Sequence, residues 1–173
     1  MNKIKITKIS EEVYEQNGFD DRGCYGTPCN DLCCMGGCDV DKESYQLIMK
    51  NKDLIEKELG IKLDKHFKSE WSGDKDYLGG DSIETQKEID KQCILHLQKG
   101  KGCVLYKLVN EKNLPRRMIP TICRLYPLNW NNELLYIDED MEKTCNCTCN
   151  QSEKKILETQ KKEIEDIFEM QIK

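Results

Sequence analysis

Eleven cysteines are the residues of this sequence best suited to chemistry, and they fall into three groups along the chain. So many cysteines in 173 residues are unusual for an intracellular protein, and an odd number cannot pair fully into disulfides within one chain. Metal ligation by thiolates is therefore the favoured interpretation. The candidate metal ligands are Cys24, Cys29, Cys33, Cys34, Cys38, Cys93, Cys103, Cys123, Cys145, Cys147 and Cys149.

The spacing of these cysteines excludes the commonest metal motifs. No pair has the C-x2-C spacing that most zinc ribbons and bacterial ferredoxins use. Cys29 and Cys33 are four residues apart, as are Cys34 and Cys38, so a helical turn would place each pair on one face. The run 145–149 has a cysteine at every second position, which would share one face of an extended segment. We expect the three groups to converge only when the chain folds.

Four thiolates complete either a structural zinc site or a [4Fe–4S] cluster, so both metals are compatible with the ligand type. The first hypothesis is an iron–sulfur protein for electron transfer, redox sensing or cluster-dependent chemistry, with a redox partner protein. In it, backbone N–H groups of the glycine-rich first group would bond to cluster sulfides, and Arg124 would offset the negative charge. The alternative is a protein that binds or chelates zinc without redox activity. Metal ions are the expected partners in both.

The order of the cysteines resembles a known bacterial family. A crowded first group is followed by Cys93 and Cys103, and then by the segment PTICRLYP at 120–127. This pattern is similar to the YkgJ-type cysteine-cluster family of zinc- or iron-chelating domains, which includes part of the flagellin lysine N-methylases. The first group departs from that family, reading C-x4-C-x3-CC-x3-C in place of C-x2-C-x2-CC. The resemblance implies metal binding, and it alone suggests the third hypothesis, an enzyme that modifies a protein or small molecule.

The remaining polar residues give weaker signals. His66 is expected to have a surface or half-buried role, and His96 is a weak ligand candidate because strand alternation would turn it away from Cys93. Asp41 is expected to cap a helix, and Arg116-Arg117 to form a solvated turn. The sequence contains no GxGxxG, P-loop, HExxH or GxSxG motif, so nucleotide-binding and common hydrolytic functions lack support.

Charge and hydropathy restrict the partners and the compartment. The formal charge of −5 and the pI near 5.2 argue against nucleic acid, which requires a basic surface. The first twenty residues lack the apolar stretch of a secretory signal, and no window of 18 apolar residues follows. We therefore expect a cytoplasmic protein without a membrane segment.

Periodicity predicts short elements of both kinds. We expect a strand at Ile4 and Ile6, extending as far as Val13, and an irregular connection over 69–82 held by Trp71 and Tyr77. A helix is expected from Asp41 to Leu59, with Gly60 as its stop. Two hairpins are expected, one with arms 93–97 and 103–106 and one over 123–138. A charged amphipathic helix should run from Ser152 to Lys173.

These elements predict a small α+β domain of residues 1–150 and a C-terminal amphipathic helix of residues 151–173. Apolar residues are 38% of the chain, below the usual 45–50%, so metal–thiolate bonds should supplement a thin core. The apolar stripe of the last helix must dock either on the domain or on a second copy of the chain, which would give a homodimer.

Overall fold

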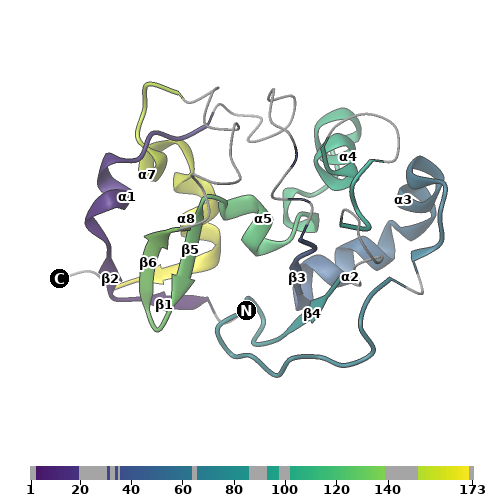
Figure 1. The fold of residues 1–173 in the computed structure, drawn as a ribbon, viewed down its shortest axis with the longest axis horizontal. Coiled ribbons are helices and arrows are strands. Elements are labelled where there is room, and N and C mark those ends of the chain that lie inside the picture. The colour runs from purple at the N-terminus through teal and green to yellow at the C-terminus, as the bar shows by residue number, and fades with distance from the viewer. Residues whose placement is uncertain are drawn as a thin grey trace.

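A computed structural model shows a mixed arrangement of short helices and short strands (Figure 1). It describes residues 3–19, 31, 34, 36–63, 66–85, 93–97, 102–138 and 152–171. The strands are β1 (Ile4–Ile6), β2 (Lys8–Ile9), β3 (Asp39–Asp41), β4 (Ser82–Glu84), β5 (Leu128–Asn131), β6 (Leu134–Ile137) and β7 (Phe168–Met170). The helices are α1 (Glu11–Glu15), α2 (Lys42–Lys50), α3 (Lys52–Leu59), α4 (Val104–Lys112), the 3-10 helix η3 (Arg116–Met118), α5 (Thr121–Leu125), α7 (Ile156–Thr159) and α8 (Lys161–Ile167). The expected mixture of helices and strands is confirmed.

The strands form three small sheets among the described residues. β1 pairs in parallel with β7, and β3 pairs antiparallel with β4. The third sheet has the order β2-β6-β5, in which β2 runs parallel to β6 and β5 runs antiparallel to it. Each sheet is too small to be stable alone, so the helices packed on it must supply most of the buried apolar surface.

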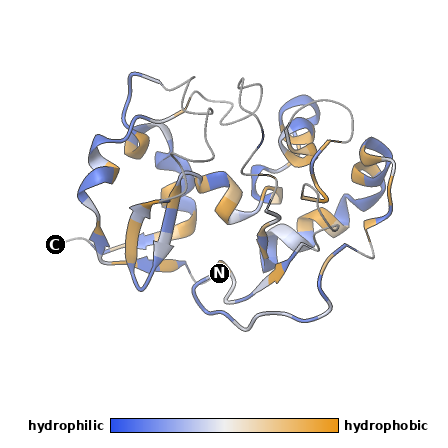
Figure 2. Ribbon diagram, viewed as in Figure 1, coloured by the Kyte–Doolittle hydropathy of each residue, from blue (hydrophilic) through white to orange (hydrophobic). Residues whose placement is uncertain are grey.

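Buried apolar side chains gather into two cores, and α5 lies between them in Figure 1. The first core joins α2, α3, α4, η3 and the β3–β4 pair. The second joins α1, α7 and α8 to the other two sheets. In Figure 2 the apolar faces of these elements turn inward on both sides of α5. Because Cys123 packs on the first core and Leu125 lies in the second, α5 connects the two.

The helix expected over residues 41–59 is present as two consecutive helices. Asp41 caps α2, as predicted, because its side chain accepts a hydrogen bond from the Ser44 N–H at 2.9 Å. Asn51 interrupts the helix and begins α3, and Gly60 ends α3 in the left-handed conformation at φ 73°. The cap matters for the site described below, because the same carboxylate reaches a second helix.

One of the two expected hairpins is confirmed and the other is half helical. β5 and β6 pair from Leu128↔Ile137 to Asn131↔Leu134, so this hairpin is confirmed, and its two-residue turn is Asn132-Glu133, one residue later than the Asn131-Asn132 turn that the sequence predicts. Cys123 precedes that hairpin in a helix, α5, and not in a strand. For the other hairpin, His96 pairs with Cys103 in an antiparallel bridge, but the chain then forms α4. The apolar spacing in α4 follows a helical period, which outweighed the strand propensity of its first residues.

Val13 and the C-terminal segment correct two further expectations. Val13 is buried in α1 and belongs to no strand. The continuous helix expected over 152–173 is wrong: α7 and α8 are separated at Gln160, and Phe168–Met170 form β7. The edge of β1 supplies backbone hydrogen bonds to residues 168–170, which a helix there would forgo. The described apolar stripe packs into the second core of the same chain, so it supplies no surface for a second copy.

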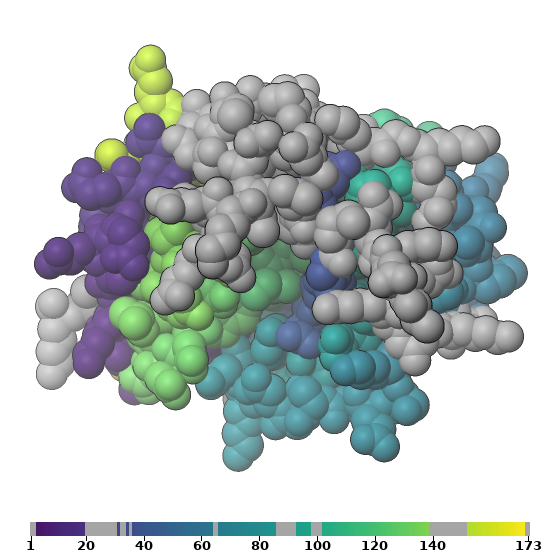
Figure 3. Space-filling model, viewed as in Figure 1, coloured from purple at the N-terminus to yellow at the C-terminus, as the bar shows by residue number. Residues whose placement is uncertain are grey.

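The connection over residues 69–82 is irregular, as expected, and Figure 3 shows it at the lower edge of the molecule. The Tyr77 hydroxyl donates to Asp39 Oδ2 at 3.1 Å, and the Trp130 Nε1–H donates to the Asp76 carbonyl at 2.7 Å. Trp71 contacts Tyr45 edge to face, with ring centroids 5.2 Å apart. Within the described residues, no helix has the length and apolar character that crossing a bilayer requires.

An ion-pair network joins the two cores, in contrast to the solvated turn expected at Arg116-Arg117. Arg117 donates to Asp166 and to Glu43, and Arg116 pairs with Glu163. Burial acts to raise the pKa of Asp166, but hydrogen bonds from Arg117 and Arg124 outweigh it and leave that pKa below its ordinary value. The network therefore fixes α8 against η3 and α2.

Stability is expected to fall as the pH drops below about 4, the ordinary pKa of an aspartate. Because the pKa of Asp166 is lower in the folded chain, its contribution is complete above that pH and is lost as the carboxylate is protonated. Asp166→Asn should flatten the dependence of the unfolding free energy on pH between about 5 and 3, by on the order of 1 kcal/mol. Denaturant unfolding across this range measures the effect. Asp53→Asn, at an exposed position, is the control, and equal slopes for the two variants would contradict the prediction.

Candidate metal centre

Three cysteine thiols from distant parts of the chain lie in contact at the first core. Cys38 directly precedes β3, Cys93 begins a turn, and Cys123 lies in α5. The Cys38 thiol is hydrogen-bonded to the thiols of both Cys93 and Cys123, and Cys103, the N-cap of α4, is close enough to interact with it electrostatically. No disulfide joins any two of the five described cysteines. Three cysteines separated by up to 85 residues therefore meet at one place, and Cys103 packs against the same core.

The surroundings of these thiols favour their protonated form. The hydrogen bond with Cys123 is the main cause that raises the pKa of Cys38 well above its ordinary value; the bond with Cys93 opposes it, and burial adds to it. The hydrogen bond with Cys38, followed by burial, likewise raises the pKa of Cys93. A buried thiol with a raised pKa is a poor nucleophile. A bound cation would reverse this balance, because it replaces the proton and stabilises the thiolate.

Thr85 fixes the positions of Cys38 and Cys93. Its hydroxyl accepts a hydrogen bond from the Cys38 N–H at 2.9 Å and lies 4.0 Å from the Cys93 sulfur. Its own N–H donates to the Cys38 carbonyl at 3.0 Å, which extends the β3–β4 pairing by one residue. Since Thr85 is fully buried, these bonds do not compete with water.

Asp41 fixes the position of Cys123 relative to Cys38. Its carboxylate, fully buried, accepts hydrogen bonds from the Thr121 N–H at 2.8 Å and from the Thr121 hydroxyl at 2.7 Å, besides those from Ser44. One side chain therefore caps α2 and holds the first residue of α5. Because Cys123 lies two residues into α5 and Cys38 three residues before Asp41, the carboxylate sets the distance between the two thiols.

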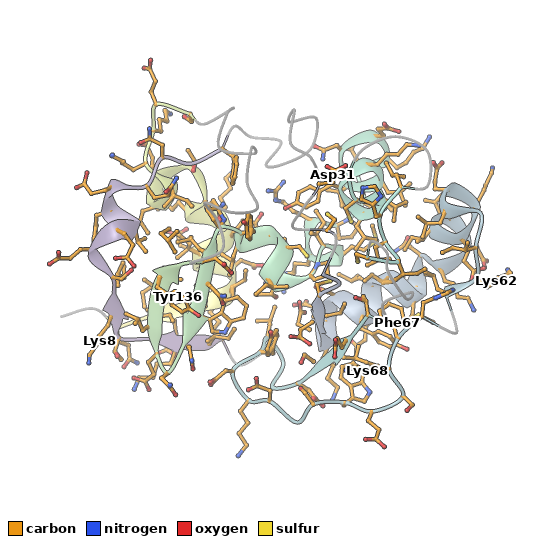
Figure 4. The ribbon with its side chains drawn as sticks, viewed as in Figure 1. Lys8, Asp31, Lys62, Phe67, Lys68 and Tyr136 are labelled. Atoms are coloured by element: carbon orange, nitrogen blue, oxygen red, sulfur yellow. The ribbon has the colours of Figure 1, made fainter. Side chains whose placement is uncertain are left out.

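His96 and Asp31 form a buried pair beside the thiols. His96 Nε2 lies 3.1 Å from Asp31 Oδ2, and the same oxygen accepts a hydrogen bond from the Gly102 N–H at 3.0 Å. Asp31 also accepts the Cys34 N–H through its carbonyl oxygen, at 2.9 Å. In Figure 4 Asp31 lies beside α4. His96 is 3% exposed, and its Nδ1 has no hydrogen-bond partner in the part of the chain that the structure describes.

Arg124 does not serve the role expected from its place beside Cys123. Its Nη1 donates to Glu163 at 2.9 Å and to Asp166 at 3.1 Å, so these carboxylates already balance its charge. Its Nε and Nη2 are buried, and no partner for them occurs among the described residues. The guanidinium therefore belongs to the network between the cores.

The structure covers fewer than half of the eleven cysteines. Cys34, Cys38, Cys93, Cys103 and Cys123 are described, and Cys34 accepts the Cys93 N–H through its carbonyl oxygen at 2.5 Å. The remaining candidate ligands lie outside the described residues, so their place stays a prediction: Cys24, Cys29, Cys33, Cys145, Cys147 and Cys149. Among the residues described, no group of three or more cysteine, histidine or carboxylate side chains is arranged to hold a metal ion. The contacting thiols are hydrogen-bonded in a row through Cys38.

The residues that surround the thiols belong to no sequence motif that marks them as part of a site. Thr85 and Asp31 belong to no motif, and Thr121 is recognisable only as a residue that follows a proline at a helix start. The strand alternation expected between Cys93 and His96 does not apply, because the His96 N–H donates to the Cys93 carbonyl at 2.8 Å and makes residues 93–96 a turn.

Comparisons with family models, with curated proteins and with solved structures found no match to this chain.

Proposed function

We propose that this chain is a metal-binding protein whose centre is built on Cys38, Cys93, Cys103 and Cys123. The observation that carries the proposal is the contact of the Cys38 thiol with those of Cys93 and Cys123, across 55 and 85 residues of chain. Thiols from three separate elements that form no disulfide rarely meet by packing alone. Thiolates are strong ligands for zinc and for iron–sulfur clusters. The family resemblance of the PTICRLYP segment supports the same function.

A single tetrahedral zinc ion would require the smallest rearrangement of these thiols, which are not arranged as a metal site in the described residues. With zinc–sulfur bonds of about 2.3 Å, tetrahedral geometry places neighbouring sulfurs about 3.8 Å apart, a distance at which sulfurs touch. Sulfurs in contact can thus become zinc ligands by losing their protons and turning about χ1. In this role zinc joins β3, α4 and α5 and adds bonding energy to a thin apolar core.

An iron–sulfur cluster is the second candidate, and the number of cysteines favours it. One zinc ion requires four ligands, whereas the chain has eleven cysteines, enough for two four-thiolate centres. A [4Fe–4S] cluster binds each thiolate to a different iron, so the described sulfurs would have to move apart. Such a cluster would give the protein a role in electron transfer or redox sensing.

Anaerobic expression of the untagged chain followed by elemental analysis tests the proposal. We expect about one zinc per chain and a colourless protein that dithionite and air leave unchanged. A brown protein with iron, sulfide and absorbance near ~400 nm would instead establish the second candidate. A folded protein with less than a tenth of an equivalent of any metal, even after incubation with zinc and reductant, would overturn both.

A further inference from the structure

The histidine beside the thiols has one ring nitrogen whose bonding the fold leaves unexplained. His96 is 3% exposed, and its Nδ1 is buried without a hydrogen-bond partner among the described residues. A buried polar atom that lacks a hydrogen-bond partner lowers the stability of the folded state, so native proteins rarely retain one without a function. The other ring nitrogen, by contrast, is held by Asp31.

The bonds of Asp31 determine which nitrogen of His96 carries the proton. Asp31 Oδ2 accepts the Gly102 N–H, so this oxygen acts as an acceptor toward the imidazole too. The proton of His96 therefore resides on Nε2, and Nδ1 presents a lone pair.

The backbone pairs His96 with one of the cysteines. The His96–Cys103 bridge is flanked by hydrogen bonds from Leu97 N to Gly102 O and from Val104 N to Leu95 O. This pattern makes His96 and Cys103 a non-hydrogen-bonded antiparallel pair, in which the Cα atoms are about 4.5 Å apart and both side chains lie on one face. Cys103 in turn interacts electrostatically with Cys38. His96 and Cys103 thus lie side by side, and Cys103 packs on the same core as Cys38.

We infer that His96 Nδ1 is a nitrogen ligand of the cysteine centre and that Asp31 is its positioning residue. The inference rests on the proposed metal-binding function and makes the centre a mixed site of three sulfurs and one nitrogen, in which His96 takes the place of one of the four thiols. A metal-bound histidine commonly donates its second N–H to a carboxylate, which fixes the tautomer and the ring orientation and strengthens the ligand. Asp31 and His96 have this arrangement. The metal class is a cation that accepts both thiolate and imidazole, such as zinc.

X-ray absorption at the zinc edge tests the inference on a variant that leaves the site intact. The chain has two histidines, so in His66→Ala every imidazole signal comes from His96. We expect a first shell of sulfur with one nitrogen and the multiple scattering of an imidazole ring. The chain must be free of a histidine tag. Zinc bound in stoichiometric amount with sulfur alone would overturn the inference and leave the proposed function intact, whereas failure to bind zinc would overturn both.

Asp31→Asn tests the positioning role separately. The amide oxygen can still accept from Nε2 but lacks the negative charge, so zinc affinity should fall by about 10- to 100-fold while the imidazole scattering persists. Competition with a chromophoric chelator measures the affinity. Denaturant unfolding in the presence of excess chelator is the control, because it measures the stability change that does not depend on metal and so separates it from the change in zinc affinity. Unchanged zinc affinity would show that Asp31 does not act through His96.

Discussion

Cys38→Ser is expected to abolish metal binding and to lower the unfolding free energy by on the order of 5 kcal/mol or more. Cys38 is the thiol that contacts both Cys93 and Cys123, so its loss breaks the row of sulfurs at the centre. A serine hydroxyl has a shorter bond to its carbon and binds zinc far more weakly than a thiolate does. Because structural zinc contributes directly to folding, metal content and thermal stability should fall together.

The chelator response of the parent protein provides the control for this variant. Removing metal should lower the unfolding midpoint of the parent, whereas the same chelator should leave the midpoint of Cys38→Ser nearly unchanged. Such non-additivity distinguishes a lost ligand from a cavity or a buried hydroxyl, whose cost would persist with or without metal. Retention of stoichiometric metal by Cys38→Ser would show that this thiol is not a ligand.

Asp41→Asn is expected to destabilise the fold by about 3–4 kcal/mol at neutral pH. The buried carboxylate accepts four hydrogen bonds, two from Ser44 and two from Thr121, and bonds to a charged acceptor contribute about 1.5–3 kcal/mol each. All four partners of this carboxylate are hydrogen-bond donors, and the NH2 group of an asparagine is a donor too, so it would face donors with no acceptor for its own hydrogens. The cap of α2 or the attachment of α5 must then be lost.

The effect of Asp41→Asn should extend to the metal site. Because α5 carries Cys123, loosening its attachment should weaken metal binding as well as lower the unfolding free energy. Asp39→Asn is a matched control on the same strand, since Asp39 accepts a hydrogen bond from the Tyr77 hydroxyl at the edge of the molecule. Its expected cost is below about 1 kcal/mol. Similar losses for the two variants would contradict the role given to Asp41.

Local signals in the sequence predicted the elements that short-range interactions determine. The capping side chain of Asp41 and the left-handed stop at Gly60 delimit their helices, and the Asn132-Glu133 turn fixes the register of β5 and β6. In each case the partners are at most ten residues apart. Propensity and turn chemistry therefore suffice to predict these elements.

Elements whose form depends on distant partners were beyond such reasoning. Phe168–Met170 pairs as a strand with Ile4–Ile6, which lies 164 residues earlier, so no local pattern indicates it. The second bonds of Asp41, to Thr121 across 80 residues, are equally invisible in a window of sequence. Tertiary context commonly overrides propensity at such places.

In the candidate site, too, local sequence signals identify some features and distant contacts determine the others. The cysteines could be recognised by their number and type, but their convergence depends on packing between β3, α4 and α5. His96 Nε2 contacts Asp31 Oδ2, which is 65 residues away along the chain. Spacing can therefore suggest which residues bind metal, while the assignment of partners requires the fold.

The pairing of β1 with β7 has a consequence for how the chain is made in the cell. Residues 4–6 are synthesised well before residues 168–170, which are their strand partner. At synthesis rates of about 5–20 residues per second, Ile4 and Ile6 must wait on the order of ten seconds before this sheet can close. The nascent chain thus presents an unpaired apolar edge until residues 168–170 are made, and chaperones that recognise such edges are expected to bind it during that interval.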